Sequence, residues 1–173
     1  ALPLRQKRLA QLPRAVGAPM SRQELLGAAM IADSPDEVRV RVREQLMKGA
    51  VHIKLTAGGG VASPHSPLDA STFTTEELRA AVEAAENWGT YVGVHAYTTA
   101  SIRRAIDAGA KVIEHGHLMD EATAKLIADK GVWLSTQAFP EELGNAFPPG
   151  SFEREKFMAV LGGTAVNYRV AKK

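Results

Sequence analysis

Two histidines and one lysine occupy matching positions in this sequence. His95 and His115 each stand six residues after a glycine, and Lys54 stands five residues after one. The residues between are β-rich and apolar, which is typical of short buried strands that begin just after a helix-ending glycine. In parallel α/β folds the working groups collect at the carboxyl ends of strands. We therefore predict that Lys54, His95 and His115 meet at one edge of a parallel sheet.

Those three side chains could hold a divalent metal. A lysine inside a barrel is costly unless it is neutralised or paired. The Lys54 amine could take up carbon dioxide and become a carbamate, an anionic oxygen ligand able to bridge two cations, beside the neutral imidazoles of His95 and His115. Nitrogen and oxygen ligands of this kind suit zinc, bound as one or two ions. Manganese, cobalt and nickel are the alternative metals. Such a centre would make water nucleophilic near neutral pH and polarise a carbonyl under attack.

Side-chain alternation tests whether these groups can converge. Lys54 and His95 fall on the polar sides of their strands, opposite the apolar sides that helices should cover. In the third strand, Glu114 falls on the helix side if His115 points inward. His52 lies deeper in the first strand, so we expect it to be a core residue.

Two further side chains are candidate substrate-binding residues. Tyr97 lies just beyond His95 on the same side of its strand, although packing at the rim is an equal alternative. His117 forms a His-x-His pair with His115. Because it lies just past the predicted strand, a role in supporting the ligands or contacting substrate is favoured over metal binding.

Composition narrows the class of protein. The 173 residues are 45 % hydrophobic and 23 % charged, which is ordinary for a globular domain. The net charge of +2 gives no case for nucleic acid or a membrane surface, and no apolar run approaches the roughly 18 residues of a membrane span. The absence of cysteine excludes a disulfide or thiolate site. We expect a cytoplasmic protein with a small-molecule or dipeptide substrate. A homo-oligomer stays open, as does an upstream targeting segment, because the chain starts at Ala1.

Helix-start and helix-stop signals place four helix–glycine–strand units in order. N-cap candidates are Ser34, Thr74 or Thr75, Thr98 or Thr99, and Asp120, and the closing glycines are Gly49, Gly89, Gly109 and Gly131. The predicted strands are 51–56, 91–96, 112–115 and 132–136. A short helix is expected over 21–29, and another runs from 152 to the end with Gly162-Gly163 weakening its middle.

Alternating helices and strands with short connections specify a parallel sheet. A closed eight-stranded barrel needs about 250 residues, so four units predict part of one. The fold class is therefore α/β, a partial (β/α)8 TIM-like barrel. Its predicted parts are a poorly defined N-terminal segment (1–32), the central βα units (33–139) and a C-terminal loop and helix (140–173).

Three motifs resemble the amidohydrolase superfamily, and within it the imidazolonepropionase-like group often labelled Xaa-Pro dipeptidases. They are Ile-Lys-Leu-Thr-Ala-Gly-Gly-Gly-Val-Ala-Ser-Pro (53–64), Val-His-Ala-Tyr-Thr (94–98) and Val-Ile-Glu-His-Gly (112–116). The segments 121–126 and 134–137 also fit. The resemblance covers about 33–136 and implies a metal-dependent barrel that hydrolyses amide bonds. It makes Lys54 the carboxylated lysine of strand four, and His95 and His115 the metal ligands of strands five and six.

The family pattern also has a His-x-His on strand one and an aspartate on strand eight. The first histidine here is His52, and no aspartate follows Asp129. The chain therefore resembles the middle of such an enzyme. The favoured function is a metal-dependent hydrolase, or a fragment of one, cleaving amide or C–N bonds of dipeptides or N-acyl amino acids. The alternatives are a catalytically incomplete α/β fragment and a mononuclear deaminase of the same superfamily, which would not need Lys54.

Overall fold

The computed structural model describes residue 25, residues 29–63 and residues 65–172 of the chain. Most of the predicted N-terminal segment 1–32 therefore lies outside the described residues, as does most of the short helix expected over 21–29. Among the described residues, no helix is both long enough and apolar enough to cross a bilayer.

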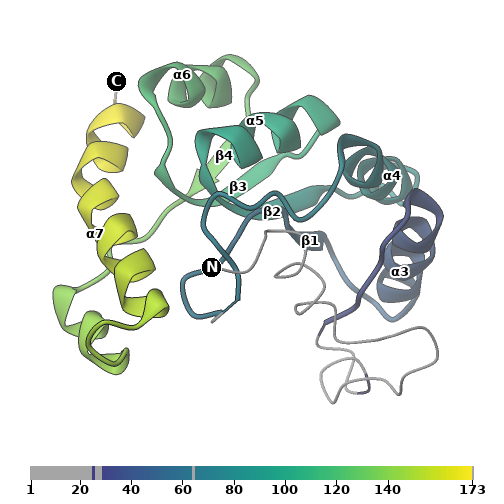
Figure 1. Ribbon diagram of the computed structural model, residues 1–173. Coiled ribbons are helices and arrows are strands. Elements are labelled where there is room, and N and C mark those ends of the chain that lie inside the picture. Colours follow the sequence, from purple (N-terminus) through teal and green to yellow (C-terminus); the bar gives the residue numbers. More distant parts are fainter. Residues whose placement is uncertain (1–24, 26–28, 64, 173) are drawn as a thin grey trace.

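One parallel sheet of four strands forms the centre of the described part of the chain, in the order β1-β2-β3-β4 (Figure 1). Each strand pairs in parallel with the next one along the sequence. The strands are β1 (Ile53–Thr56), β2 (Val92–Thr98), β3 (Val112–Leu118) and β4 (Trp133–Ser135). This arrangement confirms the predicted α/β class with about four parallel βα units.

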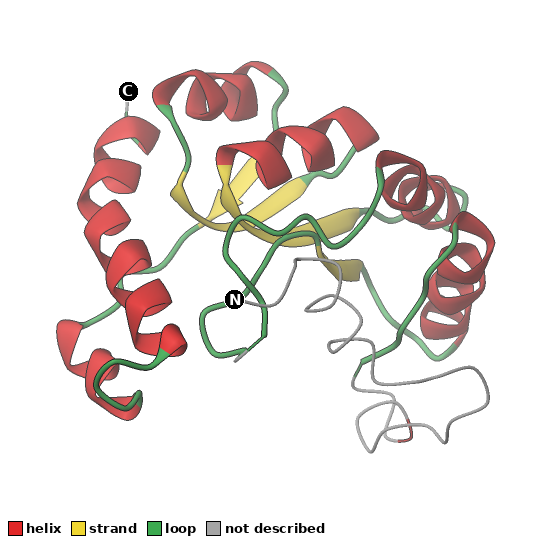
Figure 2. Cartoon of the chain, in the orientation of Figure 1, coloured by secondary structure: helices red, strands yellow, loops and turns green. Residues whose placement is uncertain are grey.

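Four helices accompany the strands and follow one another along the sheet (Figure 2). They are α3 (Pro35–Met47), α4 (Thr75–Glu86), α5 (Thr99–Ala108) and α6 (Glu121–Asp129). Each begins at a predicted N-cap whose side-chain oxygen accepts a hydrogen bond from the backbone N–H three residues later; the caps are Ser34, Thr74, Thr98 and Asp120. Gly109 closes α5 in the left-handed conformation, with a φ of 102°.

The core lies between these helices and the sheet. Val94 and Ile113 of the two central strands and Ile102 and Ala105 of α5 are all fully buried. The apolar side of β2 and β3 therefore packs on the helices, which leaves the other side of the sheet for the polar side chains.

The predicted core position of His52 is wrong. β1 begins at Ile53, two residues later than predicted, and both Val51 and His52 are exposed. The His52 ring stacks on Tyr91 with 5.5 Å between ring centroids. Both residues precede their strands, so their side chains lie at the amino ends of β1 and β2, away from the helix–sheet core.

A short 3₁₀ helix, η1 (Glu141–Ala146), precedes a long helix, α7 (Phe152–Ala171), which packs mainly against β3 and also contacts α6 (Figure 1). α7 runs unbroken through Gly162-Gly163. A Cβ at Gly163 would lie 2.2 Å from the carbonyl oxygen of His117, whereas a Cβ at Gly162 would meet nothing within 4 Å. Gly163 is thus the point of close approach between α7 and β3.

Alanine at these two neighbouring positions should have opposite effects. Gly162→Ala should raise the free energy of unfolding by about 0.5–1 kcal/mol, because alanine has less backbone entropy to lose in a helix. Gly163→Ala should lower it by about 1–3 kcal/mol, because the methyl group would push α7 off β3. Urea titration followed by circular dichroism measures both. Stabilisation by both substitutions would contradict the close approach at Gly163.

Candidate metal centre

The imidazole rings of His95 and His115 face one another across neighbouring strands. His95 lies in β2 and His115 in β3. Their ring centroids are 4.5 Å apart, with the ring planes inclined by 74°. The structure therefore brings together the two histidines that the sequence placed at matching positions of successive units.

Lys54 is paired with an acid from two strands away. Its Nζ atom forms an ion pair with Glu114 Oε2. The strand register aligns Thr56 of β1 with His95 and His95 with Glu114, so Glu114 shares the polar side of the sheet with Lys54 and His95. The prediction that Glu114 would fall on the helix side is wrong.

The reason is an interruption of strand alternation at His115. This residue has a φ of +79°, and it is the only non-glycine with positive φ among the described residues. Gly116 follows with a φ of +68°, and the β2–β3 register shifts between Ala96 and Thr98. Two consecutive left-handed residues turn the His115 ring toward His95 although Glu114 already points to that side.

Hydrogen bonds fix both rings. His95 Nε2 lies 2.9 Å from the carbonyl oxygen of Gly59, so Nε2 carries the proton and donates it there. His115 Nδ1 lies 2.9 Å from the side-chain nitrogen of Gln137 and 3.2 Å from its side-chain oxygen. Nδ1 of His95 is then the nitrogen left to bind a metal. His115 can offer Nε2 to a metal in the tautomer in which Nδ1 carries the proton and donates it to the side-chain oxygen of Gln137.

Burial favours the neutral form of both rings. Desolvation lowers the pKa of His95, and the Lys54 charge lowers it further, against the opposing effects of the Gly59 hydrogen bond and Glu114. Desolvation, helped by His95, lowers the pKa of His115 to about 4. Neutral imidazole is the form that binds metal, so both rings are ready to act as ligands near pH 7.

The two candidate substrate residues lie beside the rings but are buried. The Tyr97 ring stacks on His115 at 4.8 Å and meets His95 edge-on at 5.0 Å. Burial raises the pKa of Tyr97 to about 12. His117 is 1 % exposed, and its Nε2 donates to the carbonyl oxygen of Gln137 at 2.8 Å. Both residues therefore pack around the imidazole pair, and their contact with substrate stays a prediction.

Comparison with known proteins places this geometry in a family. The sequence pattern described as the Amidohydrolase family matches residues 5–149. The chain belongs to the amidohydrolase family. Such enzymes are generally metal-dependent hydrolases. The four parallel βα units of this chain are accordingly part of a TIM-like barrel.

Individual relatives give the same result. Ochratoxinase from Aspergillus niger is 40 % identical over 116 residues, which are 66 % of this chain and 24 % of that protein. A solved prolidase in complex with N-methylphosphonate-L-proline superposes with a TM-score of 0.80 at 34 % identity, over 92 % of this chain and 41 % of that one. A Xaa-Pro dipeptidase with methionine bound in its active site has a TM-score of 0.73 at 33 % identity, over 82 % and 36 %. The chain thus spans less than half the length of each relative.

The side chains present fit the nitrogen ligands of a metal centre but do not complete one. Within the described ranges, no three His, Cys, Asp or Glu side chains are arranged to hold an ion. His95 and His115 supply two neutral nitrogen donors. Lys54 in its ammonium form is a cation paired with Glu114 and has no lone pair to offer a metal.

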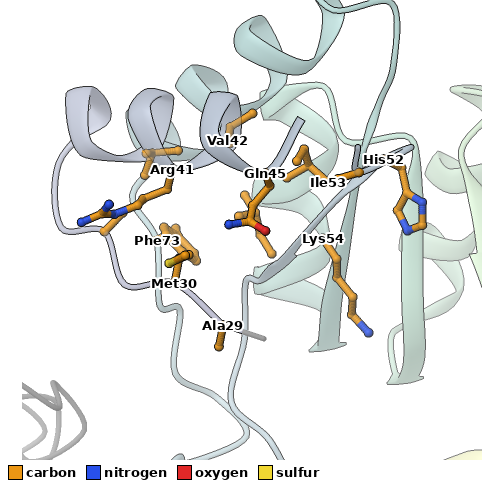
Figure 3. Close-up of a pocket in the computed structure, with 13 residues that line it drawn as sticks. Ala29, Met30, Arg41, Val42, Gln45, His52, Ile53, Lys54 and Phe73 are labelled. Carbon is orange, nitrogen blue, oxygen red and sulfur yellow. The ribbon is translucent and has the colours of Figure 1, made fainter. Parts of the chain in front are cut away.

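A pocket beside β1 is separate from the imidazole pair. It is lined by side chains of α3, β1 and the loops around them, including Gln45, Ile53 and Phe73. Figure 3 shows Lys54 extending from β1 away from Arg41 and Gln45 of α3. Lys54 therefore lies at the boundary between this pocket and the polar side of the sheet where His95 and His115 meet.

Sequence reasoning missed Gln137, Asn167 and Lys156. Gln137 holds both His115, through its side chain, and His117, through its carbonyl. Asn167 and Lys156 belong to α7 and bond the backbone around the two rings. Gln137 is the last residue of the 134–137 segment, which resembles the family. That resemblance could have identified Gln137 as a candidate site residue. The α7 residues carried none, since a lone asparagine or lysine on a helix usually faces solvent.

The low pKa of His115 predicts how stability depends on pH. In the unfolded chain His115 takes up a proton near 6.5, but in the folded chain only near 4. Neutral His115 should therefore make its full contribution to the free energy of unfolding of the metal-free protein above pH 6.5. That contribution should be lost as the pH falls toward 4. His115→Asn, which tolerates the left-handed backbone, should flatten this part of the stability curve. Urea titrations at several pH values in chelator measure it; an unchanged slope in the variant would contradict the assignment.

Proposed function

We propose that this chain is part of a metal-dependent hydrolase that cleaves amide or related C–N bonds, with dipeptides or N-acyl amino acids as substrates. The observation that carries the proposal is the pair of imidazole rings 4.5 Å apart from adjacent strands of an amidohydrolase fold, with Lys54 on the same side of the sheet. The relatives named prolidase and Xaa-Pro dipeptidase support the choice of substrate class.

In this proposal His95 and His115 hold the cation, and Lys54 joins them as a carbamate. A bound divalent ion, zinc for preference, would act as a Lewis acid and would make a water molecule nucleophilic near neutral pH. Conversion of Lys54 to a carbamate exchanges a cation for an anion beside Glu114. Two neighbouring anions repel one another, so a bound cation would offset the cost of that change.

The other side chains have supporting roles. The Gly59 carbonyl and the Gln137 amide orient the two rings, which fixes the nitrogen that each presents. Tyr97 fills the space beside both rings and keeps water from their inner faces. We retain Tyr97 and His117 as proposed substrate residues, with His117 also tying the ends of β3 and β4 together.

A second candidate is favoured by one observation, the Lys54–Glu114 ion pair. A half-exposed lysine paired with an acid is an ordinary structural arrangement, and it suits an α/β segment without activity of its own. Metal binding separates this candidate from the hydrolase. The dependence of activity on Lys54 separates the hydrolase from a mononuclear deaminase.

Metal binding should require both histidines. We expect about one zinc ion or more per chain. His95→Ala and His115→Ala should each weaken zinc binding more than about 100-fold, because even partners of ligands are worth 10–100-fold. Metal analysis and calorimetry measure this, with the exposed His52→Ala as the matched control. A metal-free protein that neither substitution alters would support the inactive candidate.

Hydrolysis should require Lys54. Because the chain spans less than half of its relatives, the assay uses the complete reading frame that contains these residues, with zinc, bicarbonate and a panel of dipeptides and N-acyl amino acids. Lys54→Ala should lower kcat by at least about 100-fold, from loss of a ligand. Added acetate or propionate should restore part of the rate by supplying an anionic oxygen in its place. Full activity of Lys54→Ala without additive would exclude the carbamate.

A further inference from the structure

We propose that one face of α7 positions the candidate metal centre, with Asn167 holding the backbone of His115 and Lys156 holding the loop that orients His95. The proposal deepens the proposed function in one respect: it takes His95 and His115 as the ligand pair. The side chains of these two α7 residues hydrogen-bond backbone carbonyls and Thr136, so both are positioning residues.

Lys156 binds the loop after β1 through three backbone carbonyls. It is 4 % exposed, and its Nζ donates to the carbonyl oxygens of Gly60 at 2.7 Å, Ser66 at 3.0 Å and Ser63. An ammonium group has three N–H donors, and each one meets a carbonyl here. The face of the Phe152 ring, 4.6 Å from Nζ, adds a cation–π contact.

The same loop sets the orientation of His95. Gly59, whose carbonyl accepts the His95 Nε2 proton, directly precedes Gly60, whose carbonyl binds Lys156. The loop is folded so tightly that a Cβ at Gly59 would lie 1.7 Å from the carbonyl oxygen of Pro67. A shift of the loop carbonyls would therefore carry the Gly59 carbonyl away from His95 and release its ring.

Asn167 holds the left-handed turn at His115. It is fully buried, and its Nδ2 donates to the His115 carbonyl at 3.0 Å and to Thr136 Oγ1 at 2.8 Å. A left-handed non-glycine residue costs roughly 1–2 kcal/mol, so this conformation needs compensation from its surroundings. The Asn167 amide supplies it and ties His115 to the end of β4.

The two positioning residues lie on a single face of α7. The buried or closely packed positions 156, 160, 163 and 167 are spaced by four, three and four residues, which is the spacing of one helical stripe. Val160 is fully buried between them, and Gly163 lies against the His117 carbonyl. A helix is stiff over three turns, so α7 fixes the β1 loop and the β3 turn relative to one another.

The test measures cobalt(II) binding and the metal-free conformation of Asn167→Ala and Lys156→Met in the 173-residue chain. Each substitution should weaken cobalt affinity 10–100-fold, the usual effect of removing a group that orients a ligand. The controls Val166→Ala and Arg169→Met alter exposed positions of the same helix and should leave affinity unchanged. Thr136→Val removes one partner of Asn167 and should cause a smaller loss, which provides a readout if Asn167→Ala does not fold.

Nuclear magnetic resonance of the metal-free chain supplies a readout independent of function. Asn167→Ala should change the backbone coupling and Cα shift of His115 toward ordinary strand values, and Lys156→Met should change the tautomer signal of the His95 ring nitrogens. Wild-type affinity in both variants, with these signals unchanged, would overturn the proposal. Failure of the unsubstituted chain to bind any metal would instead contradict the proposed function, while the metal-free signals would still decide the role of α7.

Discussion

The left-handed backbone at His115 and Gly116 is the constraint on which the candidate centre depends. In a regular strand, successive side chains point to opposite faces, so Glu114 and His115 could not both serve the polar side of the sheet. The positive φ of +79° at His115 removes that restriction. As a result Glu114 reaches Lys54 while the His115 ring meets His95.

That conformation is held from several directions. Asn167 bonds the His115 carbonyl, Gln137 bonds its ring, and Gly116 leaves space for Leu134, whose Cδ1 would lie 2.9 Å from an added Cβ. Each contact comes from a segment after β3, so the site depends on the C-terminal part of the chain. This explains why α7 lies against β3 although it belongs to no βα unit of the predicted repeat.

The packing and the charges at this site both favour the binding of a cation. His95 and His115 are packed against one another and against Tyr97 and His117. This burial lowers the pKa of both imidazoles and keeps them neutral. Lys54, half exposed at the edge of the group, forms an ion pair with Glu114. The site therefore contains two neutral donors next to an ion pair. A bound cation would be attracted by Glu114, and conversion of Lys54 to an anion would add to that attraction.

The sequence by itself determined the helix starts, the order of the parallel strands and the pairing of His95 with His115. These features depend on local signals. The signals are the N-cap side chains, the helix-ending glycines, and the two histidines that each stand six residues after such a glycine. Only the tertiary structure decided the partner of Lys54, the conformation of His115 and the contacts of α7. Glu114 lies 60 residues from Lys54, and Asn167 lies 52 residues from His115. Contacts of that separation arise from how the whole chain packs, and strand alternation alone assigned Glu114 to the opposite side.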